Sequence, residues 1–182
     1  GDINGDGFAD VLIGGNGVNS AGNNDSGASY VVFGASGGFA ASFSVSTLDS
    51  SNGFLIEGDA SGDNLGRDVS AAGDINGDGY DDIIIGAYLA DPNGNTSSGA
   101  SYVLYGSGAA FGSFVNVSQL NSFNGFAING VDANDSSGRS VDAAGDINGD
   151  GVDDLIIGAY YANPNGTIDA GETYIVFGQA SG

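Results

Sequence analysis

The nine residues Asp2-Ile3-Asn4-Gly5-Asp6-Gly7-Phe8-Ala9-Asp10 place oxygen-bearing side chains at alternate positions around two glycines. The same pattern, Asp-Ile-Asn-Gly-Asp-Gly-x-x-Asp, returns at residues 74–82 and 146–154, so that consecutive copies lie 72 residues apart. A constant repeat of this length is typical of solenoids, propellers and other arrays, in which each unit buries its apolar face on a neighbour. The motif therefore predicts both a local chemistry and a repeat architecture.

Alternating oxygen donors are the ligands that calcium prefers, because it accepts 6–8 oxygens at about 2.3–2.6 Å and a short loop can wrap around it. The glycine at the sixth position permits the sharp reversal that such a loop requires. We therefore expect one Ca²⁺ in each of three loops, held by side chains at positions 1, 3, 5 and 9, by the backbone carbonyl of position 7, and by water. The predicted ligands are Asp2, Asn4, Asp6, Phe8, Asp10, Asp74, Asn76, Asp78, Tyr80, Asp82, Asp146, Asn148, Asp150, Val152 and Asp154.

Other interpretations of these loops are weaker. Asp, Asn and Gly also make turns without a metal, but three copies in register favour a ligand set. Magnesium prefers rigid octahedral sites that retain several waters, and zinc is disfavoured because the chain has no Cys or His. An EF-hand would carry a Glu at position 12 between two helices, whereas that position is Ile13, Ile85 or Ile157 inside an apolar run.

The apolar runs that follow the loops predict buried strands, because they are short, rich in β-branched residues and closed by glycine. They are Val11-Leu12-Ile13, Ile83-Ile84-Ile85 and Leu155-Ile156-Ile157. Within one complete unit we expect four strands, at residues 66–72, 82–87, 100–105 and 125–129, with the Asp-rich loop joining the first two as a hairpin and a short helical turn at residues 118–121. Four short strands per repeat indicate an all-β fold of tandem four-stranded antiparallel blades, as in a β-propeller.

The repeat divides the chain into three units. Residues 1–65 form a first repeat without its leading strand, residues 66–137 a complete middle repeat, and residues 138–182 a third repeat that stops after its third strand. Propellers use 4–8 blades, so these are too few for a closed ring alone, and unpaired strand edges are expected to pair with other strands. The chain is either a piece of a longer array or a unit that stacks into a filament. The absence of a starting Met and of a signal segment favours a processed or truncated piece.

Two further elements recur with the same period. The first is an aromatic residue before glycine, at Phe33-Gly34, Tyr105-Gly106 and Phe177-Gly178; the second is Gly86-Ala87-Tyr88 and Gly158-Ala159-Tyr160. With the Asp-rich loops, they resemble FG-GAP repeats, the units of integrin α-subunit propellers and of many bacterial surface proteins. The resemblance implies a propeller and calcium in the three loops. Tyr stands where that family has Pro, and the first copy departs further as Gly14-Gly15-Asn16.

The charge balance supports metal binding. The formal net charge is −21, with two arginines, no lysine and 23 acids. Eleven of those acids lie in the three loops, and three calcium ions would reduce the net charge to −15. Without metal, carboxylates this close together repel, so we expect calcium to stabilise the fold. The chain has no cysteine for disulfides, and metal is a substitute. No basic patch exists to bind nucleic acid or an anionic membrane, and no membrane insertion is expected.

Arg67 and Arg139 each follow a glycine at the start of a predicted strand, amid acidic residues. We expect them to form ion pairs that brace neighbouring blades rather than to recognise a ligand. Tyr88, Tyr160 and Tyr161 follow the second strand of their units, where they either pack within a blade or stack on a sugar or another subunit.

Catalysis is not expected, because the chain lacks the His, Cys and Lys that usually act as bases and nucleophiles. The paired acids Asp81/Asp82 and Asp153/Asp154 lie in metal loops, and adjacent strand residues face opposite ways. We expect an extracellular or cell-surface, calcium-binding repeat protein with a structural role, which associates with itself or with adjoining repeats. The alternatives are an adhesion module that binds a glycan or a matrix protein, and an accessory domain of a secreted enzyme.

Overall fold

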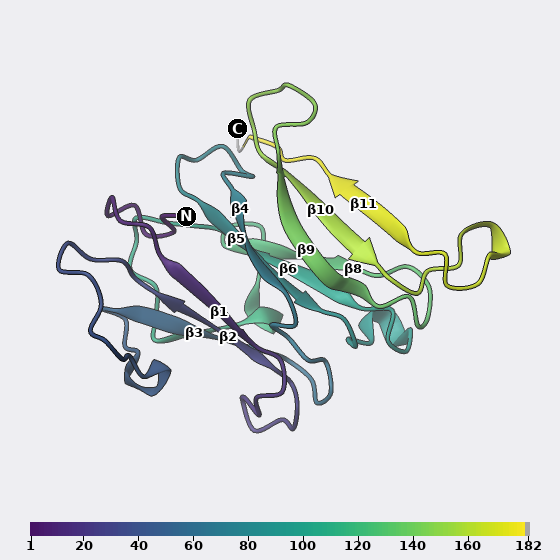
Figure 1. Ribbon diagram of the computed structural model, residues 1–182, viewed down its shortest axis with the longest axis horizontal. Helices are drawn as coiled ribbons and strands as arrows, with labels where there is room; N and C mark the ends of the chain where they lie inside the picture. The colour runs from purple at the N-terminus through teal and green to yellow at the C-terminus, as the bar shows by residue number, and fades with distance from the viewer. Residues whose placement is uncertain (181–182) are drawn as a thin grey trace.

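The chain, described here for residues 1–180 of a computed structural model, forms three β-sheets that lie side by side (Figure 1). Residues 181 and 182 of the predicted third repeat lie outside the described residues. The elements are β1 (Val11–Gly15), β2 (Ala28–Val32), η1 (Val45–Thr47), β3 (Gly53–Glu57), β4 (Val69–Gly73), β5 (Asp82–Ala87), η2 (Pro92–Gly94), β6 (Ala100–Leu104), β7 (Phe114–Asn116), η3 (Val117–Gln119), β8 (Gly125–Asn129), β9 (Ser137–Gly145), β10 (Asp154–Ala159), η4 (Pro164–Gly166) and β11 (Glu172–Val176).

Each sheet corresponds to one blade. Blade 1 has the strand order β1-β2-β3-β7, blade 2 has β4-β5-β6-β8, and blade 3 has β9-β10-β11. In blade 2 all neighbouring strands are antiparallel, and the loop at residues 74–81 joins β4 to β5 as a hairpin. The predicted all-β fold with four-stranded antiparallel blades is confirmed, and the three sheets of the described residues do not close into a ring.

One strand was not predicted. β7 belongs to the connection between β6 and β8, yet it pairs in parallel with β3 of blade 1, with Leu55 opposite Phe114 and Glu57 opposite Asn116. We call residues 107–118, which contain β7, the strap of blade 2. The expected helical turn is present nearby as η3. The middle repeat is therefore attached to blade 1 by a strand as well as by packing.

The hydrophobic cores lie between blades. The first core joins side chains of blades 1 and 2, among them Val31, Phe54, Ile83 and Ile85. A second core, which contains Ile84, Val103, Val141, Leu155 and Ile157, lies between blades 2 and 3. Because blade 2 buries one face on blade 1 and the other on blade 3, the stability of one blade depends on the position of the next.

The first apolar run is less buried than expected. Val11 and Ile13 in β1 are 42% and 39% exposed, whereas Ile83 and Ile85 at the same positions of β5 are 6% and 0% exposed. The reason is the face on which they lie: Ile83 and Ile85 pack in the core between blades 1 and 2, whereas Val11 and Ile13 face away from blade 2, where no further sheet lies among the described residues. The expectation of a buried strand is correct for β5 and β10 and wrong for β1.

The second residue of each Asp-rich loop gives a direct test of packing between blades. Ile3 and Ile75 are 2% and 3% exposed and lie in the two cores, whereas Ile147 of the third loop is 55% exposed. Ile75→Ala is expected to lower the free energy of unfolding by about 2–5 kcal/mol, because it leaves a cavity between blades. Ile147→Ala, the matched control, should change it by less than about 0.5 kcal/mol. Urea denaturation measures both, and equal losses would contradict this arrangement.

Candidate functional site

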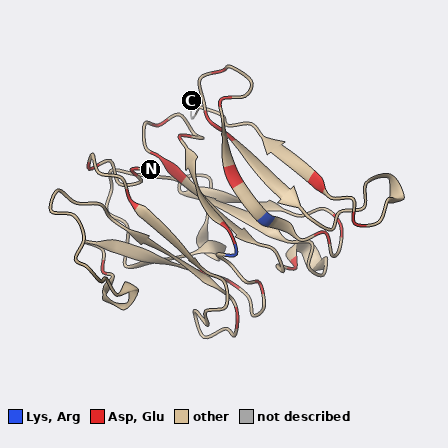
Figure 2. Cartoon of the chain, viewed as in Figure 1, with Lys and Arg blue, Asp and Glu red and all other residues tan. Residues whose placement is uncertain are grey.

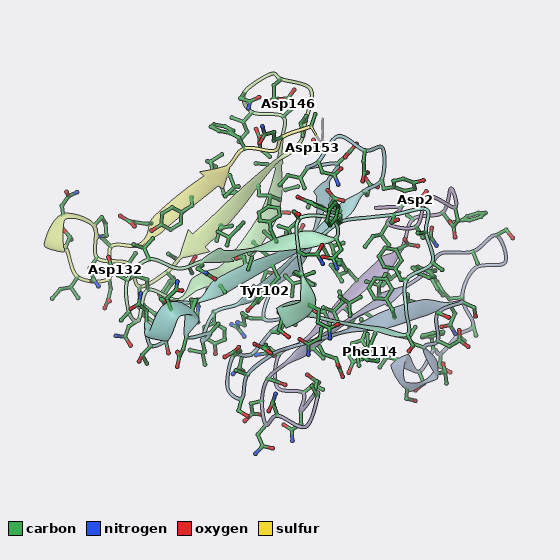
Figure 3. All side chains as sticks on the ribbon, turned by 180° about the vertical axis from the view of Figure 1, so that it is seen from behind. Asp2, Tyr102, Phe114, Asp132, Asp146 and Asp153 are labelled. Carbon is green, nitrogen blue, oxygen red and sulfur yellow. The ribbon has the colours of Figure 1, made fainter. Side chains whose placement is uncertain are left out.

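The three Asp-rich loops lie along one end of the three sheets. We call residues 2–10, 74–82 and 146–154 loops 1, 2 and 3. Loop 1 leads into β1, and loops 2 and 3 join β4 to β5 and β9 to β10. The end formed by these loops is the upper one in Figure 1, and Asp2, Asp146 and Asp153 are labelled there in the reverse view of Figure 3.

Within each loop the side-chain oxygens of Asp and Asn accept hydrogen bonds from the backbone amides of the same loop. In loop 2, the two carboxylate oxygens of Asp74 accept hydrogen bonds from the amides of Asp78 (2.9 Å) and Gly79 (2.8 Å). Asn76 Oδ1 also accepts from the Asp78 amide at 2.9 Å, and Asp78 Oδ1 accepts from Tyr80 at 3.0 Å. Loops 1 and 3 repeat these bonds at Asp2, Asn4 and Asp6 and at Asp146, Asn148 and Asp150.

Backbone conformation explains the two glycines of each loop. In loop 2, Gly77 and Gly79 have φ of 71° and 92°, in the left-handed region that side chains with a Cβ disfavour. Both equivalent glycines in loops 1 and 3 also have positive φ. The sequence pattern therefore encodes one turn geometry three times.

The ninth-position aspartate anchors each loop to its own blade. Asp82 accepts hydrogen bonds from the amides of Ile75 (3.0 Å) and Gly106 (2.8 Å), one on each carboxylate oxygen. Asp10 and Asp154 bind the equivalent amides of Ile3 and Gly34 and of Ile147 and Gly178. The glycine of the recurring aromatic-Gly element is thus the partner of this carboxylate. Each carboxylate oxygen keeps a further lone pair for a cation.

Burial makes the charge of these anchors costly. Desolvation, the largest cause, raises the pKa of Asp82 to about 7, against the lowering effect of its two backbone hydrogen bonds, while the nearby charges of Asp78 and Asp74 raise it further. Burial also raises the pKa of Asp10, again with a smaller contribution from the acids of its loop. A divalent cation would offset this repulsion, because an opposite charge favours the ionised form.

An acid in the eighth position, which is not among the predicted ligands, links neighbouring loops. Asp81 Oδ2 accepts a hydrogen bond from the Asp2 amide at 2.7 Å, and Asp153 Oδ2 accepts one from the Asp74 amide at 3.0 Å. In addition, the carbonyls of Ile3 and Ile75 accept bonds from residues 107 and 179 of the following blade, at 2.8 and 3.0 Å. The loops therefore form a continuous hydrogen-bonded seam between blades.

The donor set fits a hard cation in its chemistry, since it consists of carboxylate, amide and backbone oxygens. Among the described residues, however, no group of three or more acidic side chains is arranged so that it could hold a metal ion. The carboxylates accept loop amides, as the bonds above show. The carbonyls of Phe8, Tyr80 and Val152 stay predicted ligands. Calcium binding at the fifteen predicted positions thus stays a prediction.

The two arginines do not follow the expectation of ion pairs. Arg139 lies 5.4 Å from the ring centre of Tyr88 in blade 2, and 5.2 and 5.8 Å from those of Tyr160 and Tyr161 in its own blade. Arg67 lies 5.8 Å from the Tyr88 ring. Arg139 therefore braces blades 2 and 3 through cation–π contacts, whereas the contact of Arg67 lies within blade 2. Figure 2 shows how few basic residues there are among the acidic ones.

Acidic side chains form hydrogen bonds between blades 2 and 3. Asp68 Oδ2 in blade 2 accepts a hydrogen bond from the Val141 amide of β9 at 3.0 Å, and Ser70 Oγ donates to Asp142 Oδ1 at 2.6 Å.

No helix within residues 1–180 has the length and apolar character needed to cross a membrane.

Comparison with known proteins identifies the repeats. The FG-GAP repeat model matches residues 1–32, 65–104 and 137–176. The chain is 30% identical over 142 residues to integrin alpha-PS2 of Drosophila melanogaster. The matched region covers 76% of this chain and 9% of that protein. It is 33% identical over 96 residues to integrin alpha-2 of Bos taurus and 35% over 95 residues to that of Mus musculus, covering 53% and 52% of this chain and 8% and 7% of the relatives. The chain thus spans less than a tenth of these relatives, and it belongs to the FG-GAP repeat family, with repeats of the integrin alpha type.

Proposed function

We propose that the chain is a calcium-binding, non-catalytic structural module that acts outside the cell or at its surface, in which calcium braces the junctions between blades. The observation that supports it most is the position of the three loops. Each carries the oxygen donors of a calcium loop, and the hydrogen bonds that the Asp2 amide donates to Asp81 and the Asp74 amide donates to Asp153 connect loops 1 and 2 to the following blade. An ion bound there would stabilise the contact between blades as well as the loop itself.

The proposed role of calcium is to offset the repulsion between acidic side chains. The chain has a formal net charge of −21 and concentrates acids where the blades meet. Repulsion between those acids opposes the packing that forms the two cores, since like charges in a partly buried setting destabilise a compact state. Calcium in the millimolar range, as found outside cells, is sufficient for loops of extracellular modules.

The assembly part of the proposal concerns strand edges. β1, β8 and β11 are each one of the two edge strands of a sheet in the described residues, and such edges pair readily with another strand. We propose that they pair with adjoining repeats or with further copies, which includes a filament. Electron microscopy of the chain in calcium and in a chelator tests this, with equal magnesium as the control.

Particles that grow in calcium and disperse in chelator are expected. Particles of one size in all three solutions would contradict calcium-dependent assembly.

The second candidate function is a ligand-binding adhesion module of a larger cell-surface propeller, which the similarity to integrin alpha chains favours. A binding screen against glycans and matrix proteins tests that candidate.

A further inference from the structure

The strap of blade 2 shows how one repeat holds another. Its Phe111 ring stacks on Phe54 of blade 1, with ring centres 4.5 Å apart and planes at 14°, and it lies 6.3 Å from Phe33. The Leu55 amide of β3 donates to the carbonyl of Ser113 at 3.1 Å, next to the parallel β3–β7 pairing. An aromatic anchor and a short added strand thus dock the strap on the outer edge of blade 1.

We call the pair of aromatic rings on which a strap packs, Phe33 and Phe54 in blade 1, the platform of a blade. Blade 2 has an equivalent platform with the same geometry. Tyr105 and Phe126 lie 72 residues after Phe33 and Phe54. Their ring centres are 6.0 Å apart with planes at 54°, compared with 5.9 Å and 58° for Phe33 and Phe54. The platform of blade 2 is therefore formed although no strap of the described residues covers it.

Exposure shows what the strap does for blade 1. Phe54 and Ile56 of β3 are 0% and 1% exposed. Their equivalents in β8, Phe126 and Ile128, are only half-buried, and β8 is the outer edge strand of blade 2. We attribute this difference in exposure to the strap, because β3 pairs with β2 in the same register as β8 pairs with β6.

The first repeat carries a matching segment. Phe39 and Phe43 stand 72 residues before Phe111 and Val115 and are 50% and 41% exposed. Phe111 and Val115, in contrast, pack against the first core. The chain therefore has one docked strap, one aromatic strap segment that is exposed, and one uncovered platform.

We propose that the outer edge of blade 2, formed by β8 with Tyr105 and Phe126, is a docking surface for an FG-GAP strap, which by the order seen in blades 1 and 2 is the strap of the blade that follows blade 2. The strap adds as a parallel strand and stacks an aromatic side chain against the Phe126 ring beside Tyr105, as Phe111 does on Phe54 beside Phe33, a form of β-strand addition. The register of the occupied edge places the incoming residue that corresponds to Asn116 opposite Asn129. This inference rests on the proposed assembly role and names its partner and its geometry.

A fluorescent peptide with the sequence of residues 107–118 tests the docking by anisotropy, titrated with the full chain. We expect saturable binding, and a peptide that carries Phe111→Ala should lose about tenfold or more in affinity, as truncation of a central aromatic anchor does. On the chain, Ala127→Pro removes the backbone N–H that corresponds to the Leu55 donor. It should abolish binding without a change in melting temperature, because proline is tolerated at an outward-facing position of an edge strand.

Cysteine pairing fixes the register, because the chain has no cysteine of its own. A peptide with Asn116→Cys should form a disulfide with the Asn129→Cys chain. It should not do so with the Glu57→Cys chain, whose edge β7 already occupies. The absence of binding to a folded chain, or equal disulfide yields from both chains, would overturn the docking surface. Because peptide binding is measured separately from calcium uptake, failure of calcium binding alone would count against the proposed function and leave the strap contact standing.

Discussion

Asp78→Asn is expected to lower the melting temperature in calcium but not in the metal-free chain. In the metal-free chain the substitution removes one of the charges that raise the pKa of Asp82 and keeps an Oδ1 acceptor for the Tyr80 amide. It loses the hydrogen bond that Asn76 Nδ2 donates to Asp78 Oδ2, which limits the gain. The melting temperature should therefore stay constant or rise by about 1–3 °C, as relief of like-charge repulsion predicts.

With calcium the same substitution removes a ligand from one site. A ligand at 100 times its Kd stabilises the folded state by about 2.7 kcal/mol, and about 2–4 °C corresponds to 1 kcal/mol for a chain of this size. The variant should therefore melt about 5–10 °C below the unmodified chain in calcium. Calorimetric scans in calcium and in chelator measure both effects.

Asp59→Asn is the control for net charge, since Asp59 is exposed and lies outside the three loops. It should show no loss in calcium. If Asp78→Asn lowers the melting temperature equally in calcium and in chelator, its role is confined to the hydrogen bonds of the turn, and the loop does not depend on a cation.

Gly86→Ala should destabilise the chain by about 3 kcal/mol, because a Cβ at this position would collide with the backbone oxygen of Gly138 in blade 3. A shift of the β9 backbone that relieved this collision would move blade 3 away from blade 2. Loss of packing between blades 2 and 3 should accompany the loss in free energy of unfolding, which urea titration measures.

The matched control is Gly158→Ala, at the same place in the repeat. Its Cβ would approach the Ser140 hydroxyl, the end of a side chain that can rotate. We expect a loss of about 1 kcal/mol or less. A cost at Gly158 as large as that at Gly86 would show that the glycine serves the strand itself rather than the contact between blades.

Local features of the chain were predictable from the sequence. The loops and the strands that leave them depend on residues close in sequence, so the nine-residue motif and runs such as Ile83-Ile84-Ile85 were sufficient to predict them. The period of 72 residues then extended one unit to the others. The glycine turn of each loop was likewise predictable, because positive φ at Gly77 and Gly79 is a local requirement.

Contacts between repeats were not predictable in the same way. β7 is only three residues long and pairs with a strand about sixty residues earlier, so no local periodicity marks it. Asp81 and Asp153 were counted as loop charges, although their partners are amides in the preceding loop. The one available signal was their position, since loops 2 and 3 have an acid there and loop 1 has Ala9.

Arg139 shows why chemistry alone did not determine the partner. Acidic residues surround it in the sequence, and an ion pair was the simplest expectation. In the fold, Tyr88 of one blade and Tyr160 of the next converge on its guanidinium, while Asp68 accepts a backbone amide instead. The choice depends on how two blades are placed, which the sequence of one blade does not specify.

Isothermal titration of metal-stripped chain with calcium measures the central claim most directly. We predict uptake of three ions per chain, weaker uptake of magnesium, and a melting temperature that rises as the sites fill. Absence of calcium uptake, together with an unchanged melting temperature, would show that the Asp-rich loops hold the blades together through hydrogen bonds alone.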